Sequence, residues 1–384
     1  MLITNQITLA NARLELLSAL STPLGKGLTG QPVCLVSDPG IGKTAIVEQV
    51  AKSLGRKLVP LILSTKEGVD VTGALFYGKE GLEIRPPPWA KPLWEGPSLL
   101  FLDELSCAPP ATQGAALGIP VERRIGELAL PDSCVVVAAM NPSRRAAGGF
   151  AMSYPMANRW TWMYVRADAS EWITWVLNQE EQRPEYAEAK EWGIWVESYG
   201  RARALGSTFI ENRPELLHKI PEAGEPGAYP TPRSWERALR LLAMAFMNGR
   251  SASSLVAGTI GEAVAADFLR SIDEIGLPRI GLWLDGAESW SPSVKRGDQA
   301  LAVYRSALAL VLPRTSENRA RRADRLFASV NEAAEIGLAD AAYDTVRRLD
   351  SASLVTPEAL KANSRLAKIL QRVREEIAKK TGEK

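Results

Sequence analysis

The chain has 384 residues, enough for two or three domains, and its hydrophobic and charged fractions of 46% and 23% are ordinary for a globular protein. A net charge of +2 implies no polyanionic partner by itself. No apolar run is long enough to span a membrane, and the N-terminus is not that of a signal peptide. A single histidine argues against multi-histidine metal sites and Ser-His-Asp hydrolases, and three scattered cysteines fit a structural role in a reducing cytoplasm.

The first recognisable stretch is a strand, a short loop and a helix. Residues 11–21 predict an amphipathic helix, residues 33–36 predict a buried parallel strand, and residues 45–51 predict a helix after a Pro/Gly loop. In this context glycines let backbone N–H groups approach phosphate oxygens, and the helix N-terminus adds positive potential. The predicted nucleotide-binding residues are Asp38, Pro39, Gly40, Ile41, Gly42, Lys43, Thr44 and Ala45.

Two residues of this loop have distinct predicted tasks. Lys43 is expected to reach the β- and γ-phosphates of ATP, and the Thr44 hydroxyl is expected to ligate Mg²⁺. Ser37 stands where the motif G-x-x-x-x-G-K-[ST] has its first glycine. Because Gly40 and Gly42 remain, we expect the loop to bind phosphate, although Ser37 leaves the strength of ATP binding open. A chance Gly-Lys-Thr on a surface loop would not explain the flanking strand and helix.

Between this loop and the next motif, residues 57–65 predict a second buried strand. Ser64 and Thr65 at its end could face a nucleotide, but strand ends often carry hydroxyls, so we expect no role for them. The Gly/Pro-rich segment that follows contains a predicted hairpin with Gly78–Gly81 as its turn and Lys79 beside Glu80 at its tip.

The segment 98–104 predicts a central strand that ends in two carboxylates. Asp103 is expected to hold the hydration shell of Mg²⁺ opposite Thr44, and Glu104 to polarise the attacking water. The carboxyl ends of strands are where α/β folds bind ligands. Such a strand is weak evidence alone, but it is specific when it follows a phosphate loop.

Two more polar positions adjoin predicted strands. After a second predicted hairpin at 122–133, the buried strand 134–140 leads to Asn141, which could orient water or sense the γ-phosphate; an ordinary Asn-Pro turn is the alternative. A short helix ends at Arg159 before a last strand, 161–165. Arg159 is therefore a candidate arginine finger for a neighbouring subunit, with Arg144 and Arg145 as rivals and a surface cation at a helix end as the structural alternative.

The remaining chain is predicted to be helical, including a charged helix in the tail from residue 357. Arg233 lies near the start of the predicted helix at 232, where a cation opposes the helix dipole, so it is a candidate for reaching the γ-phosphate. The predicted domains are a nucleotide-binding core (1–166), a helical lid (167–282) and a helical C-terminal extension (283–384).

This ordered set of motifs resembles the AAA+ ATPases. The matching segments are SDPGIGKT (37–44), LLFLDE (99–104), AAMNP (138–142), ANRW (157–160) and TPRSW (231–235), which are similar to Walker A, Walker B, sensor 1, the arginine finger and sensor 2. The two hairpins and the N-R-W turn resemble the MoxR and dynein-related branch. The resemblance implies an α/β P-loop NTPase fold, a three-layer αβα core with parallel strand order 5-1-4-3-2, followed by a helical lid.

The same resemblance implies a biochemical role. Family members form rings, usually hexamers, with ATP between subunits. MoxR-like members are Mg²⁺-dependent, chaperone-like motors that remodel a protein client, often one with a von Willebrand factor A domain, or help a metal cofactor enter its enzyme.

Two other functions stay open. A nucleic-acid motor would need a hairpin tip rich in cations and aromatics, and both predicted hairpins mix lysine or arginine with glutamate. A nucleotide-gated scaffold would result if Ser37 weakened the loop so that ATP is bound and hardly hydrolysed.

Overall fold

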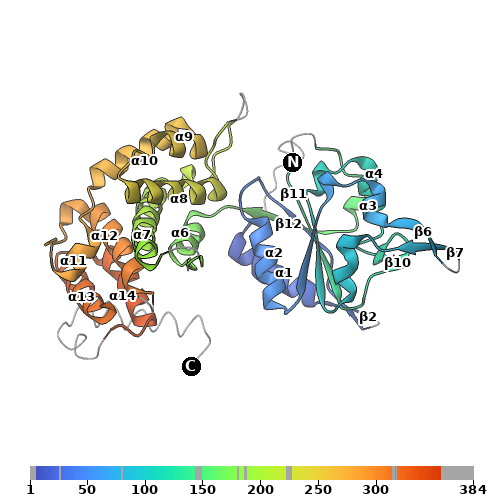
Figure 1. The fold of residues 1–384 in the computed structure, drawn as a ribbon, viewed down its shortest axis with the longest axis horizontal. Helices are drawn as coiled ribbons and strands as arrows, with labels where there is room; N and C mark the ends of the chain where they lie inside the picture. Colours follow the sequence, from blue (N-terminus) through green and yellow to red (C-terminus); the bar gives the residue numbers. More distant parts are fainter. Residues whose placement is uncertain are drawn as a thin grey trace. The chain divides into compact units, whose positions relative to one another are not determined.

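A computed structural model describes residues 6–25, 27–78, 81–142, 149–179, 181–185, 188–221, 227–313, 316 and 318–355 of the chain. The predictions for Arg144 and Arg145, for the hairpin tip at 79–80 and for the tail from residue 357 concern residues outside this set. The chain divides into two compact units, Met1–Glu171 and Trp172–Lys384, which are described separately (Figure 1).

The first unit is built on a six-stranded sheet whose neighbouring strands all run parallel. In spatial order the strands are β1 (Ile7–Thr8), β12 (Thr161–Arg166), β4 (Val33–Val36), β11 (Cys134–Met140), β8 (Ser98–Asp103) and β5 (Lys57–Ile62). Apart from the short edge strand β1, this is the predicted order 5-1-4-3-2, with β4 as the first strand. The fold prediction is confirmed, and it brings the carboxyl ends of β4, β11 and β8 to one edge of the sheet.

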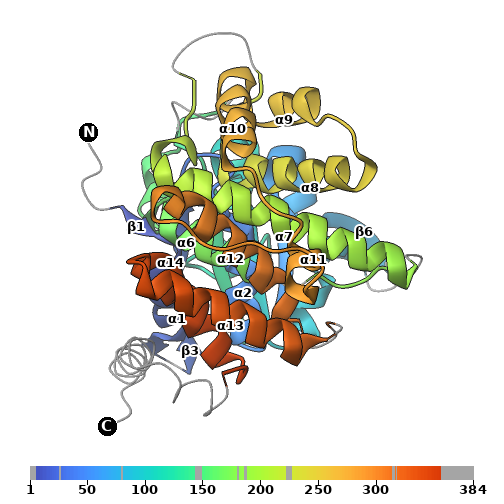
Figure 2. The same cartoon turned by 90° about the vertical axis from the view of Figure 1, so that its left-hand side faces the viewer.

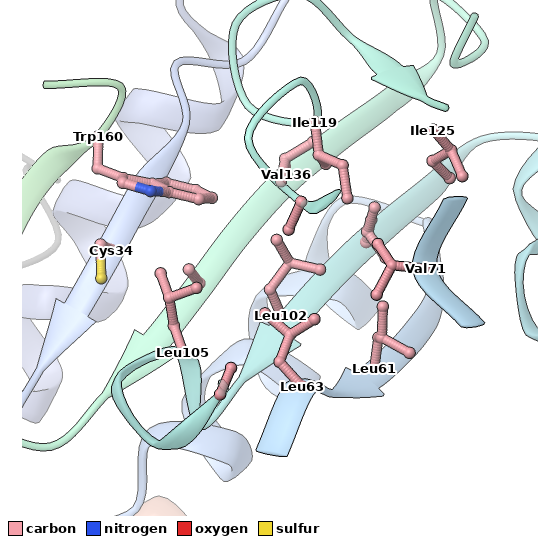
Figure 3. Packing of buried hydrophobic residues seen from close by; sticks show 14 of the residues in the cluster. Cys34, Leu61, Leu63, Val71, Leu102, Leu105, Ile119, Ile125, Val136 and Trp160 are labelled. Atoms are coloured by element: carbon pink, nitrogen blue, oxygen red, sulfur yellow. The ribbon is translucent and has the colours of Figure 1, made fainter. Parts of the chain in front are cut away.

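The central strands are continuous apolar runs because helices cover both faces of the sheet. Every residue of β4 and β11 is buried. Helices α1 (Leu9–Ser21) and α2 (Lys43–Ser53) pack on one face, as Figure 1 shows. Alternate residues point to the other face, where Leu102 and Val136 pack with Leu105 and Trp160 (Figure 3). These layers form the expected αβα core.

Short elements connect the strands of this unit. Its other helical segments are η1 (Leu63–Thr65), α3 (Gly68–Thr72), η2 (Pro88–Trp94), η3 (Leu105–Cys107), α4 (Pro110–Ala115) and α5 (Tyr154–Ala157). Its antiparallel pairs are β2 (Pro23–Gly25) with β3 (Leu28–Thr29), β6 (Ala74–Gly78) with β7 (Gly81–Arg85), and β9 (Arg124–Ile125) with β10 (Leu128–Ala129). Both predicted hairpins are confirmed, because β6 and β7 pair Gly78 with Gly81 and β9 and β10 flank Gly126.

The prediction of a buried strand over 57–65 is wrong in two respects. Strand β5 ends at Ile62, and residues Leu63–Thr65 form the 3₁₀ turn η1. Burial also alternates along β5, and the Ile62 side chain is 47% exposed, because the strand lies at the sheet edge. Pro60 is tolerated at an edge strand, which needs ladder hydrogen bonds on only one side.

The second unit is helical. Its elements are α6 (Ala169–Leu177), which begins before the division, α7 (Ala189–Asn212), η5 (Pro214–Leu216), α8 (Pro232–Asn248), α9 (Ser253–Ile260), α10 (Glu262–Ile275), α11 (Ile280–Asp285), η6 (Val294–Arg296), α12 (Gly297–Val311), α13 (Arg319–Glu335) and α14 (Ala339–Ser351). Helices α12, α13 and α14 pack against one another (Figure 2). Among the described helices, none has the length and apolar composition that crossing a membrane requires.

Helix α8 carries Arg233. It is held by a capping hydrogen bond at its N-terminus and by buried aromatic packing along one face. The Thr231 hydroxyl accepts a hydrogen bond from the N–H of Ser234 at 3.1 Å, and Pro232 occupies the first helical position. The fully buried Trp235 lies 5.1 Å from Phe268, centroid to centroid. Arg233 is exposed on the first turn of this helix.

Candidate nucleotide-binding and hydrolysis site

The phosphate loop joins β4 to α2 through two glycines with left-handed backbone conformations. Gly40 has φ 77° and Gly42 has φ 121°, which residues with a Cβ rarely adopt. Helix α2 begins at Lys43, and no side chain caps it through a hydrogen bond at Gly42. Its first turn contains no acidic residue, so the positive potential of the helix end is not opposed within that turn. This arrangement suits an anionic ligand.

Lys43 is held by oxygen atoms at the tips of two neighbouring strands. Its Nζ donates to Asn141 Oδ1 at 2.7 Å and to the Ser37 carbonyl at 3.0 Å. These acceptors come together because β4 and β11 pair Val36 with Met140, so that Ser37 and Asn141 follow side by side. Both acceptors are neutral, so these contacts orient the ammonium group without neutralising it.

Ser37 fits into the loop despite replacing a glycine of the motif. The residue is 3% exposed, and its hydroxyl donates to the Asp38 carbonyl at 3.0 Å. The same hydroxyl accepts a hydrogen bond from Lys43 Nζ at 3.1 Å. Both the carbonyl and the hydroxyl of Ser37 therefore accept hydrogen bonds from the lysine, which also donates to the Asp38 carbonyl at 3.4 Å.

Thr44 and Asp103 supply the candidate magnesium ligands. The Thr44 hydroxyl donates to Asp103 Oδ2 at 3.3 Å. Hydroxyl and carboxylate oxygens are the hard donors that Mg²⁺ prefers, usually with one or two carboxylates and the phosphates of the substrate. Within the described residues there is no group of three or more His, Cys, Asp or Glu side chains that could hold a metal ion. The donor set therefore fits a magnesium ion that binds together with a nucleotide.

Burial raises the pKa of Asp103, and this outweighs the N–H of Glu104 and the nearby Lys43, which act in the opposite direction. An ionised Asp103 thus opposes folding of the metal-free protein at neutral pH. A carboxyl whose pKa is raised by folding contributes stability below its ordinary pKa and loses it as the pH rises through the raised value.

Asp103→Asn is consequently expected to stabilise the metal-free protein while it weakens Mg²⁺-dependent ATP hydrolysis. Urea denaturation in EDTA should give a higher midpoint for the variant near pH 7.5, and the difference should shrink towards about pH 4 as the wild-type carboxyl protonates. Equal midpoints for the two proteins near pH 7.5 would show that the buried charge has no cost.

Glu104 follows Asp103 in a left-handed conformation with φ 57°, and its N–H donates to Asp103 Oδ1 at 2.8 Å. Its exposed side chain accepts a hydrogen bond from the Ser64 hydroxyl. The contact arises because Ile62 of β5 pairs with Asp103 of β8, so that Ser64 and Glu104 both lie just beyond the ends of neighbouring strands. The sequence pattern did not predict that Ser64 would bind the Glu104 carboxylate. The only indication in the sequence is that Ser64 follows the strand that pairs with β8.

The five polar residues predicted from the strand ends and the loop, Lys43, Thr44, Asp103, Glu104 and Asn141, lie at one edge of the sheet. The structure also describes two of the four candidate arginines, Arg159 and Arg233. Among the described residues Arg159 makes hydrogen bonds to Glu122 and Pro155, and Arg233 belongs to the second unit. The finger and sensor roles of these arginines remain predictions.

Comparison with known proteins places this geometry in context. No family model matches the chain. Midasin from Giardia intestinalis is 29% identical over 156 residues, which is 38% of this chain and 3% of Midasin, so the chain spans only a small part of that relative.

The similar solved structures include a proposed ATPase from Cytophaga hutchinsonii, with 16% identity over 68% of this chain and 88% of that one and a TM-score of 0.32. RuvB from Thermotoga maritima has 13% identity over 78% of this chain and 84% of its own, with a TM-score of 0.38. Because these TM-scores are low, the two structures add nothing to what the strand order of the chain itself shows. That order and the phosphate loop give the first unit the predicted P-loop NTPase fold, and together with the similarity to Midasin they support the resemblance of the chain to AAA+ ATPases of the MoxR and dynein-related branch.

Proposed function

We propose that the chain is a Mg²⁺-dependent ATPase that works as a ring of identical subunits, a hexamer by family resemblance, and remodels a protein client. The observation that carries the proposal is the meeting of Lys43 with Asn141, and of Thr44 with Asp103, at the carboxyl ends of adjacent strands. A basic side chain, a helix N-terminus and a hydroxyl–carboxylate pair at one sheet edge suit a nucleoside triphosphate with its metal.

The roles of the residues follow from their positions. Lys43 exchanges its contacts with Ser37 and Asn141 for the β- and γ-phosphate oxygens, and charge-assisted hydrogen bonds favour this exchange. Thr44 and Asp103 hold the magnesium ion, which when bound neutralises phosphate charge. Glu104 orients the attacking water and accepts its proton.

Arg159 provides the part of the site that we assign to a neighbouring copy. Its guanidinium would stabilise the charge that develops on the γ-phosphate during hydrolysis. Hydrolysis would then be an event at the interface between subunits, and it could alter the geometry of a ring and do work on a client. A von Willebrand factor A-domain protein is the client that the family resemblance favours.

Glu104→Gln tests the hydrolytic assignment. The amide keeps the shape of the side chain and removes its basic oxygen, so we expect kcat to fall roughly 10²–10⁴-fold while ATP still binds. Phosphate release and equilibrium nucleotide titration measure the two quantities. Glu127→Gln, at an exposed glutamate beside the turn between β9 and β10, is the matched control and should behave as wild type. Wild-type turnover by Glu104→Gln would show that another group is the base.

A nucleic-acid motor remains the second candidate because hairpin β6–β7 exposes aromatic side chains. Tyr77 is 87% exposed and Phe76 is 47% exposed, and the Arg85 guanidinium lies 5.3 Å from the centre of the Phe76 ring. Such a surface can stack on bases or contact apolar segments of a protein. Binding to single-stranded DNA that falls steeply with salt would favour a nucleic-acid motor, since phosphate contacts release counterions.

A nucleotide-gated scaffold, the remaining alternative, would differ from the proposed ATPase only in hardly hydrolysing the ATP that it binds. A protein that binds ATP and changes its assembly state, but releases no phosphate above background with or without partners, would be a nucleotide-gated scaffold. Ser37 is the residue on which this alternative depends, and its fit within the loop favours a working phosphate site.

A further inference from the structure

We propose that Glu122 is a positioning residue for Arg159, and that their ion pair fixes the guanidinium in the orientation that completes the ATP site of a neighbouring copy. The inference rests on the proposed function, because it assigns Glu122 a task only if Arg159 acts between subunits. It concerns the first residue of the second predicted hairpin (122–133), to which the sequence motifs assign no role in the ATP site.

The pair has a bidentate, side-on geometry. Arg159 Nη2 donates to Glu122 Oε1 at 2.6 Å, and Arg159 Nε donates to Oε2 at 3.3 Å. Nη1 donates to the Pro155 carbonyl at 2.9 Å. A guanidinium has five N–H donors, and these contacts use three of them. One N–H remains on each terminal nitrogen, which is the fork that binds phosphate oxygens in pairs.

Arg159 sits on firmly anchored backbone. The preceding helix α5 is fixed by Met156, and the following residue is Trp160, which is 6% exposed. Both side chains belong to the buried cluster on one face of the sheet, in which Figure 3 shows Trp160. The Trp160 indole N–H also points to the Met156 sulfur at 3.4 Å. The buried Met156 and Trp160 therefore anchor the backbone that carries the Arg159 side chain.

Glu122 is anchored just as firmly through the residue after it. Arg123 has a left-handed backbone with φ 53°, and its guanidinium donates to the carbonyls of Pro131 and Cys134 at 2.7 Å each. These bonds hold the start of the hairpin to its end. An ordinary surface ion pair joins two flexible side chains and fixes neither, whereas this pair joins two fixed segments that lie 37 residues apart.

The surroundings fit a contact with a second copy of the chain. Val121, which precedes Glu122, is 57% exposed, and Tyr154, which precedes Pro155, is 92% exposed. The Arg159 side chain is 24% exposed. Tyrosine and arginine are enriched in surfaces that a protein partner covers. The hydrogen bonds within the pair lower the pKa of Glu122 and raise that of Arg159, so both stay charged at neutral pH.

The direct test compares Glu122→Ala and Glu122→Gln with Glu127→Ala. A partly exposed pair adds little to folding, so thermal midpoints should stay close to that of the wild type. We expect Glu122→Ala to lower kcat roughly 10–10²-fold with KM for ATP little changed, because a mispositioned cation acts mainly on the transition state. Glu122→Gln should lie between, since its amide oxygen can accept one of the two bonds. Glu127, an exposed partner of Arg124 on the same hairpin, should be neutral.

A mixed-subunit experiment separates positioning from a structural role. Glu122→Ala subunits have an intact phosphate loop, and Lys43→Ala subunits have an intact Glu122–Arg159 pair. Mixing the two should raise activity above the sum of the separate proteins, because a Lys43→Ala neighbour supplies a positioned arginine. A defect confined to the fold of Glu122→Ala would not be relieved in this way.

The outcomes also distinguish this inference from the function on which it rests. Wild-type kcat in Glu122→Ala, or a defect that mixing does not relieve, overturns the positioning role. If Arg159→Ala itself retains full activity, or if the wild type hydrolyses no ATP, the proposed function fails first.

Discussion

Replacement of Lys43 by alanine is expected to abolish measurable ATP binding. The ammonium group of this lysine contacts residues at the ends of two neighbouring strands, Asn141 after β11 at 2.7 Å and Ser37 after β4 at 3.0 Å. Each charge-assisted hydrogen bond to phosphate contributes roughly 1.5–3 kcal/mol, so the loss of two weakens binding about 10²–10⁴-fold. Titration with a fluorescent ATP analogue in the presence of Mg²⁺ measures the change directly.

The matched control is Lys52→Ala, at an exposed lysine in the last turn of the same helix α2. It removes the same charge from the same element at the end away from the loop. We expect its ATP affinity to equal that of the wild type. If Lys43→Ala bound ATP as tightly as Lys52→Ala does, the loop between β4 and α2 would not be the phosphate site.

The second large effect is expected for Arg159→Ala. An arginine supplied by a neighbouring subunit is worth roughly 10³–10⁵ in kcat in comparable phosphoryl-transfer sites, and it acts mainly on the transition state. The variant should therefore bind ATP and hydrolyse it very slowly. Arg124→Ala removes an exposed arginine from the neighbouring hairpin and should leave turnover unchanged.

Mixing Arg159→Ala with Lys43→Ala subunits shows where the arginine acts. Each protein alone should be inactive, and the mixture should recover activity because the two defects lie in different halves of a shared site. Failure to recover would mean that Arg159 serves its own subunit. Full activity of Arg159→Ala alone would end its assignment as the finger and make Arg144 and Arg145 the next candidates.

The core of the fold could be predicted from sequence because its strands are buried on both faces. The run 134–140 has no solvent-facing residue, and the same holds for 33–36, so each is a continuous apolar segment. Their order then follows from the resemblance. The segment 57–65 has a similar apolar composition, but its strand lies at the edge of the sheet, where Ile62 is half exposed. Apolar composition alone does not distinguish an edge strand from a central one.

The contacts that orient the candidate site were beyond the reach of sequence patterns. Ser64 and Glu104 are 40 residues apart and meet only because β5 lies beside β8. Glu122 and Arg159 are 37 residues apart and meet through a hairpin and a helix corner. Motif spacing describes local geometry, such as a loop before a helix, whereas these pairs depend on strand register and loop packing.

The left-handed backbone of Glu104 implies that thermal stability and the rate of ATP hydrolysis place opposite demands on this position. A residue with a Cβ at φ 57° holds a conformation that costs roughly 1–2 kcal/mol and that glycine adopts freely. Laboratory evolution that rewards heat resistance alone should therefore replace Glu104 by glycine and abolish the proposed ATP hydrolysis. Persistence of the carboxylate under such selection would show that the side chain, which accepts a hydrogen bond from Ser64, adds more stability than the left-handed backbone costs.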